Sequence, residues 1–169
     1  MLLFKRLLCG FVLLMSLSHC AFKPLYSSYE GEAVGLLASV KVANIEGRYG
    51  QIMRNALLNK LTPQGIPQRP EYILEVNMDF SERELGVAKD ATATRSEVTL
   101  LVNYKLIDHK TGKVLYTGRE MESADHNVLT HSYYSNIVSE DNTKEGTIEL
   151  MSDLIKLSLS SYLTSQETS

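Results

Sequence analysis

Alternation of apolar and polar residues over residues 72–80, interrupted only by Ile73, is the feature that most constrains the fold of this 169-residue chain. One face of this segment is apolar and consists of Tyr72, Leu74, Val76, Met78 and Phe80. The other face carries Glu75, Asn77 and Asp79. A period of two predicts a strand with one buried and one wet face, as in many antiparallel sheets. The rest of the chain therefore has to supply a layer that covers the apolar face.

Three other segments predict strands. Residues 39–45 are rich in β-branched side chains, and residues 93–108 carry a long apolar alternation. Residues 114–123 predict a strand that returns antiparallel, because Gly112 in the intervening turn tolerates a positive φ. Residues 81–90 are charged, and they predict a fraying strand end or a turn.

Two segments predict amphipathic helices. Residues 48–61 have apolar side chains at helical spacing and are followed by Pro63. Residues 125–138 predict a polar loop, and Ser139 with two following acids predicts the N-cap of the second helix. The core face of that helix is marked by Ile148, Met151, Ile155, Leu159 and Tyr162. The order β-α-β-β-β-α predicts a two-layer α+β sandwich: a mostly antiparallel four-stranded sheet with both helices on its apolar face.

The N-terminal segment predicts the compartment. Lys5 and Arg6 precede residues 7–17, which are uncharged and mostly apolar. This stretch is shorter than the about 20 residues of a membrane-spanning helix and is typical of a signal peptide. Removal of residues 1–19 takes away both charges and no acid, so the net charge falls from −3 to −5. Such acidity argues against nucleic acid as a partner.

The end of this segment, Leu17-Ser18-His19-Cys20, resembles the lipobox of bacterial lipoproteins. The resemblance implies that Cys20 carries acyl chains, which hold a protein on a bilayer. Cys9 would leave with the signal peptide, so no thiol remains for a disulfide or a metal site. Ala21, where Asp would mark inner-membrane retention, implies delivery to the outer membrane, facing the periplasm. The expected organisation is a signal peptide at 1–19, a lipid-anchored extended tether at 20–38, an α+β domain at 39–164 and a tail at 165–169.

The sequence holds no strong catalytic or metal-binding motif. Neither GxSxG, HExxH nor a P-loop occurs. His126 and His131 are five residues apart, a poor repeat for two metal ligands, and we interpret them as solvated loop histidines. Asp79, Glu82 and Glu84 are candidates for paired catalytic carboxylates, but a charged strand end accounts for them more simply. No catalytic residue, cofactor or metal is therefore predicted.

Six basic residues lie on the central hairpin or just before it: Lys89, Arg95, Lys105, Lys110, Lys113 and Arg119. One interpretation is a solvated sheet edge and turn. The other is a local anion-binding patch, able to hold phosphate groups through charge-assisted hydrogen bonds. The choice depends on whether these side chains converge in space.

Three stretches in this order resemble the LptE family of lipopolysaccharide-assembly lipoproteins, in its shorter alphaproteobacterial form. They are Cys20-Ala21-Phe22-Lys23-Pro24-Leu25-Tyr26, the hairpin from Arg95 to Gly118, and Ser132-Tyr133-Tyr134-Ser135-Asn136 with the helix after it. The resemblance implies a non-enzymatic role. Such proteins plug the outer-membrane β-barrel LptD, help it to assemble, and bind lipopolysaccharide on its way to the outer leaflet.

The resemblance also implies site residues. The family's lipopolysaccharide contacts are attributed to basic residues near strand ends, which Arg95 matches best by position, followed by Lys89 and Lys113. One alternative is an auxiliary lipoprotein of an ABC-type lipid-trafficking system, which also has alternating strands and a terminal helix. An enzyme on a lipid anchor is a more distant alternative.

Overall fold

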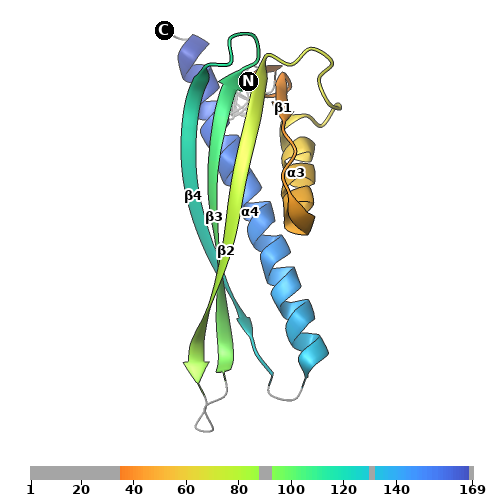
Figure 1. Cartoon of the computed structure of the whole chain (residues 1–169), viewed down its shortest axis with the longest axis vertical. Helices are drawn as coiled ribbons and strands as arrows, with labels where there is room; N and C mark the ends of the chain where they lie inside the picture. The colour runs from red at the N-terminus through yellow and green to blue at the C-terminus, as the bar shows by residue number, and fades with distance from the viewer. Residues whose placement is uncertain (1–34, 88–92, 130–131, 168–169) are drawn as a thin grey trace, which may run out of the picture. The chain divides into compact units, whose positions relative to one another are not determined.

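The computed structural model describes residues 35–87, 93–129 and 132–167. Its elements, in chain order, are β1 (Val40–Val42), α3 (Gly47–Leu61), β2 (Tyr72–Val87), β3 (Ala93–Asp108), β4 (Val114–Asn127) and α4 (Tyr133–Glu167) (Figure 1). This order confirms the predicted β-α-β-β-β-α arrangement. The expected signal peptide, Cys20, Lys89 and His131 lie outside the described residues.

The strands form one four-stranded sheet in the order β1-β2-β3-β4. β1 pairs in parallel with the first three residues of β2, whereas β2, β3 and β4 pair antiparallel. The sheet is therefore mixed but mostly antiparallel, which confirms the predicted class. The turn between β3 and β4 closes on Asp108, whose carboxylate accepts hydrogen bonds from the backbone N–H groups of Lys110 at 2.9 Å and Thr111 at 2.6 Å. Gly112 supplies the positive φ of +68° that this turn requires.

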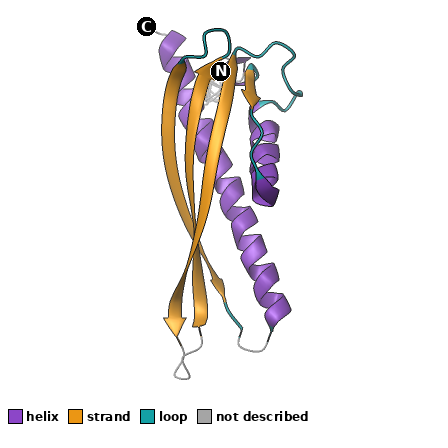
Figure 2. Cartoon of the chain, viewed as in Figure 1, coloured by secondary structure: helices purple, strands orange, loops and turns teal. Residues whose placement is uncertain are grey.

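Both helices lie on the apolar face of the sheet (Figure 2). α4 contacts β3 and β4, and α3 contacts α4 and β1. The fully buried residues from β3 are Val98, Leu100, Val102, Tyr104 and Leu106, and those from α4 include Ile148, Met151, Ile155 and Leu159. Each such aliphatic side chain contributes about 1.5–3 kcal/mol when it leaves water. This layer of side chains confirms the prediction that the helices cover the apolar face.

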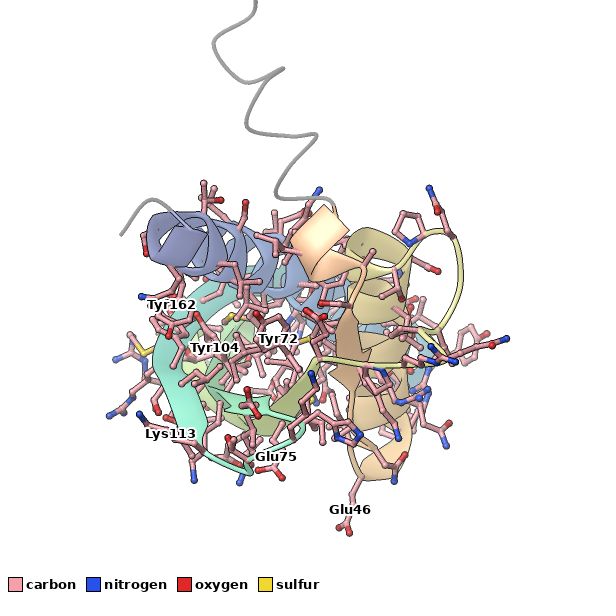
Figure 3. All side chains as sticks on the ribbon, turned by 90° about the horizontal axis from the view of Figure 1, so that it is seen from above. Glu46, Tyr72, Glu75, Tyr104, Lys113 and Tyr162 are labelled. Atoms are coloured by element: carbon pink, nitrogen blue, oxygen red, sulfur yellow. The ribbon has the colours of Figure 1, made fainter. Side chains whose placement is uncertain are left out.

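Tyrosines fill the core near the turn between β3 and β4. Tyr104 and Tyr162 lie between the sheet and α4, whereas Glu75 lies on the opposite side of the sheet (Figure 3). The rings of Tyr116 and Tyr162 stack at a centroid distance of 4.8 Å. Burial raises the pKa of Tyr104 well above its usual range. Its neutral hydroxyl group donates to the carboxylate of Glu120 at 3.3 Å.

Several element boundaries differ from the prediction. β2 continues to Val87 through the segment predicted to fray, and β4 continues to Asn127. The predicted loop at 125–138 is wrong, because α4 begins at Tyr133 and places Ser139 inside the helix. The side chain of Asn136 links the two ends of this connection, since it accepts from the N–H of Leu129 at 2.8 Å and donates to its carbonyl at 2.9 Å.

The core also draws on residues near the ends of the expected domain. Leu37, in the segment expected to form the tether, is only 2% exposed and belongs to the core. At the other end, α4 continues to Glu167, three residues into the segment expected to form the tail.

Candidate functional site

The ends of three strands and one helix meet at one end of the sheet. β2 ends there at Val87, β3 begins at Ala93, β4 ends at Asn127 and α4 begins at Tyr133 (Figure 1). The strand register confirms the meeting, because Arg95 pairs with Asn127 on one side and with Gly86 on the other. We call this region the distal end. The turn between β3 and β4 lies at the opposite end of the sheet.

A polar pocket of about 470 Å³ lies at the distal end. We call it the distal pocket, and its lining residues are Arg95, Asp125, His126, Asn127, Ser139, Asn142 and Thr143. Guanidinium, amide, hydroxyl and imidazole groups are all represented, so it offers hydrogen-bond donors and acceptors to a ligand. It combines the end of β4 with the second and third turns of α4, which lie more than ten residues apart in the sequence.

His126 is the most buried polar residue of the distal pocket. Its side chain is only 4% exposed, and its Nε2 lies 3.8 Å from Oε1 of Glu82. The same carboxylate oxygen accepts a 2.9 Å hydrogen bond from Oγ of Ser96. Within the described residues, Nδ1 of His126 has no hydrogen-bond partner. An unsatisfied buried polar atom costs about 1–3 kcal/mol, so a ligand or water that reaches it gains a contact that the protein does not supply.

Arg95 supplies the positive charge of the distal pocket. Its Nη2 lies 2.5 Å from Oδ2 of Asp125, and its side chain is 57% exposed. An exposed pair of this kind contributes about 0–1 kcal/mol to stability. Its exposed surface leaves the guanidinium group accessible to a phosphate or carboxylate, at a small loss from the pairing with Asp125.

The other described basic residues of the hairpin do not gather around Arg95. Lys113 lies beside the turn between β3 and β4, where its carbonyl accepts from the N–H of Asp108. The β3 strand between Arg95 and Asp108 spans roughly 40 Å at 3.3 Å per residue. Lys105 and Arg119 pair with Thr117 and Asn103 along the middle of the sheet. The described cations therefore do not form one anion-binding patch.

The face of the sheet that the helices leave uncovered is polar, as the alternation predicts. We call it the open face, and its cross-strand rows are Glu75–Lys105–Thr117, Asn77–Asn103–Arg119 and Asp79–Leu101–Met121. A depression of about 520 Å³ lies over the first two rows, beside Asn44. Together the three rows hold two acidic side chains, Glu75 and Asp79, and two basic ones, Lys105 and Arg119, so these rows carry no net charge. The exception to their polarity is Leu101 beside Met121, which is 67% exposed.

The remaining sequence candidates do not assemble a catalytic or metal centre. The expectation of a solvated loop is wrong for His126, which is a buried residue of β4. Asp79 points to the open face, whereas Glu82 and Glu84 have the opposite phase of β2. Among the described residues, no group of three His, Cys, Asp or Glu side chains is placed to hold a metal ion. In the sequence, the one sign of this burial is spacing. His126 lies an even number of residues after Gly118 on β4, so both face the helices.

Comparison with known families decides the classification. The model of the LptE family, described as lipopolysaccharide-assembly, matches residues 37–157. The chain belongs to the LptE family. The match spans β1 to β4 and most of α4, so the open face and the distal pocket both belong to the LptE part of the chain.

Individual proteins are similar to the chain in sequence or in fold. A Rickettsia prowazekii protein is 26% identical over 135 residues, which cover 80% of each chain. A candidate lipoprotein from Caulobacter crescentus has a similar structure with a TM-score of 0.67 and 21% identity, covering 80% of this chain and 98% of that one. The rare lipoprotein B from Shewanella oneidensis has a TM-score of 0.60 and 11% identity, covering 76% and 96%. These structures show that the chain shares their fold.

The described helices give no sign of a membrane span. Among residues 35–87, 93–129 and 132–167, no helix is both long enough and apolar enough to cross a bilayer.

Proposed function

We propose that this LptE chain is an outer-membrane lipoprotein that occupies the lumen of an LptD-type β-barrel, helps the barrel to assemble, and binds lipopolysaccharide during its transport. The observation that carries the proposal is the family match over the folded domain, which supports a role in lipopolysaccharide assembly. Cys20 would hold the protein on the periplasmic face of the outer membrane through its acyl chains.

The open face supports the barrel partnership. The interior of a large outer-membrane barrel is polar and wet, so a plug has to present mainly polar surface to it. Glu75, Lys105 and Arg119 give the open face both signs of charge in adjacent rows. The apolar face is already buried under α3 and α4, so insertion into such a lumen would expose no core.

The distal pocket supports lipopolysaccharide binding. Lipopolysaccharide carries phosphate groups and sugar hydroxyls, which Arg95 and the amide, hydroxyl and imidazole groups of the distal pocket can hydrogen-bond. Lys89 lies in the segment 88–92 that joins β2 to β3, and we propose that it adds a second cation beside Arg95. Because Lys113 lies roughly 40 Å away, it would act as a separate contact.

This role requires no covalent chemistry from the chain. Binding, plugging and assisted assembly all rely on complementary surfaces, and the family match supports a non-enzymatic protein.

Isolation of a tagged full-length chain from detergent extracts of whole membranes tests the barrel partnership. A large outer-membrane β-barrel that stays folded in SDS unless the sample is boiled should co-purify with the tagged chain in a constant ratio. A variant with charge reversals on the open face, Lys105→Glu and Arg119→Glu, should recover less barrel, whereas the turn variant Lys110→Glu should recover as much as the wild type. Recovery of an inner-membrane transporter without a barrel would contradict the proposal and favour the ABC-type alternative.

A further inference from the structure

Both ring nitrogens of His126 lack a close partner within the described residues. Nδ1 is buried and has no hydrogen bond. Nε2 lies 3.8 Å from Oε1 of Glu82, which is too far for a hydrogen bond but close enough for two opposite charges to attract each other. The imidazole nevertheless lines the distal pocket. A buried polar side chain in this state calls for an explanation beyond packing.

Carboxylates outnumber cations around this imidazole in the described part of the chain. On β2, Glu82 and Glu84 face the same side of the sheet as His126. Asp125 of β4 adds a third negative charge, which Arg95 of β3 offsets at 2.5 Å. The two carboxylates of β2 form no ion pair with a described lysine or arginine. The surroundings of His126 are therefore acidic before a ligand binds.

The other described charges near the distal pocket neutralise one another in pairs. Arg83 of β2 lies 2.8 Å from Glu97 of β3. In α4, Glu140 is paired with Lys144 one turn later. The side chains that α4 contributes to the pocket lining are all uncharged: Ser139, Asn142 and Thr143. While His126 is neutral, the described residues therefore offer an incoming anion no cation that is free of a carboxylate.

We propose that the distal pocket binds its anion together with one proton, which His126 takes up. The proposal rests on the proposed function, in which the pocket holds a phosphate group of lipopolysaccharide beside Arg95. Histidine is the side chain whose charge changes between pH 5 and 8, so it supplies the missing cation near neutral pH. The protonated ring would pair with Glu82 through Nε2 and would attract the anion in the pocket that it lines.

Proton uptake and anion binding then reinforce each other. The coupling is reciprocal, so the factor by which protonation tightens anion binding equals the factor by which the anion favours protonation. Anion binding should therefore tighten as the pH falls from 8 to 6, and a bound anion should raise the pH at which His126 changes charge. A pocket that relied on Arg95 alone would show neither effect, because a guanidinium group stays charged over this range.

Nuclear magnetic resonance of the histidine rings measures this coupling. The lipidated full-length chain, in detergent and labelled at histidine, is titrated from pH 8 to pH 5 with and without inorganic sulfate at constant ionic strength. Sulfate is a tetrahedral anion like phosphate, but its own charge does not change over this range. Sulfate should raise the titration midpoint of His126 by about half a unit, equivalent to about threefold tighter anion binding by the protonated form. His109, exposed in the turn between β3 and β4, is the internal control and should not shift.

A variant connects the proton to the proposed ligand. His126→Asn keeps a polar side chain that cannot gain charge, and circular dichroism checks its fold. The ratio of wild-type to variant affinity for lipopolysaccharide should rise several-fold from pH 8 to pH 6, and this ratio cancels the titration of the ligand's own phosphates. An unchanged His126 midpoint in sulfate, or saturable binding with the same pH dependence in both proteins, would overturn the proposal and leave the proposed function intact. Absence of saturable lipopolysaccharide binding at every pH, with the sulfate shift present, would instead contradict the proposed function alone.

Discussion

The hydroxyl group of Tyr49 in α3 donates a 2.5 Å hydrogen bond to Oδ1 of Asp141 in α4, across 92 residues of sequence. Arg48 reaches the other carboxylate oxygen of Asp141 at 3.0 Å and Glu145 at 3.2 Å. Burial raises the pKa of Tyr49 to about 12, so its hydroxyl group keeps the donated proton throughout the neutral range. This cluster joins the start of α3 to the third turn of α4.

The link predicts a loss of stability in acid. The hydrogen bond from Tyr49, assisted by Arg48, holds the pKa of Asp141 below its ordinary value of 3.8. A lowered pKa means that the ionised carboxylate stabilises the fold above pH 3.8, and that this contribution is lost as the pH falls through the lower value of the folded state. Tyr49→Phe should therefore flatten the decline of unfolding free energy below pH 4, measured by urea titration at a series of pH values.

Tyr133→Phe is the matched control for this pH dependence. Its side chain is 83% exposed, so removal of its hydroxyl group should leave the acid profile unchanged. An acid profile of Tyr49→Phe that superimposes on the wild type would show that the link to Asp141 does not contribute.

Gly118 in β4 predicts a steric effect. A Cβ atom on this residue would lie 2.1 Å from Cζ of Tyr104, whose ring is fully buried. Gly118→Ala should therefore lower the unfolding free energy by about 1–3 kcal/mol, the usual cost of overpacking a core. Chemical denaturation measures the loss, and Thr117→Ala, on the open face next to it, should change stability by about 0.5 kcal/mol or less. Equal stabilities of the two variants would contradict the packing of Tyr104 on Gly118.

The buried histidine of the distal pocket predicts a separation of stability from binding. His126→Leu removes the unpartnered Nδ1 and keeps a similar volume, so stability should stay the same or rise slightly. Lipopolysaccharide binding by the full-length variant should weaken several-fold, because an imidazole that lines the distal pocket is lost. A large loss of stability in thermal unfolding, with unchanged lipopolysaccharide binding, would instead indicate that His126 only packs in the core.

The periodic segments could be predicted because their burial follows their local pattern. The apolar side chains of the alternation at 72–80 and of the helical spacing at 48–61 pack in the same core, and these segments form β2 and α3. The start of α4 could not be predicted in this way. Its first turns place Tyr133 and Tyr134 in solvent, so no buried stripe marks them, while Ser139 imitates an N-cap inside the helix.

The candidate site was less predictable than the fold. The resemblance to the family pointed to Arg95, and the structure places it in the distal pocket. The sequence around His126 predicted a loop. Glu120 and Glu122 face the same side of β4 as His126, so no apolar alternation marks this part of the strand. Its burial comes from α4, beyond a connection whose length no local pattern reveals. Register between distant elements, rather than composition, creates this pocket.

The most direct test of a role in lipopolysaccharide assembly is the affinity of the detergent-solubilised full-length chain for lipopolysaccharide. Wild type, Arg95→Glu and Lys113→Glu are compared, since the two variants make the same change of charge at opposite ends of β3. The account predicts saturable binding by the wild type, a loss of about tenfold or more for Arg95→Glu, as for a lost charge-assisted hydrogen bond, and a much smaller loss for Lys113→Glu. Equal affinities of Arg95→Glu and the wild type, or no saturable binding by the wild type, would contradict it.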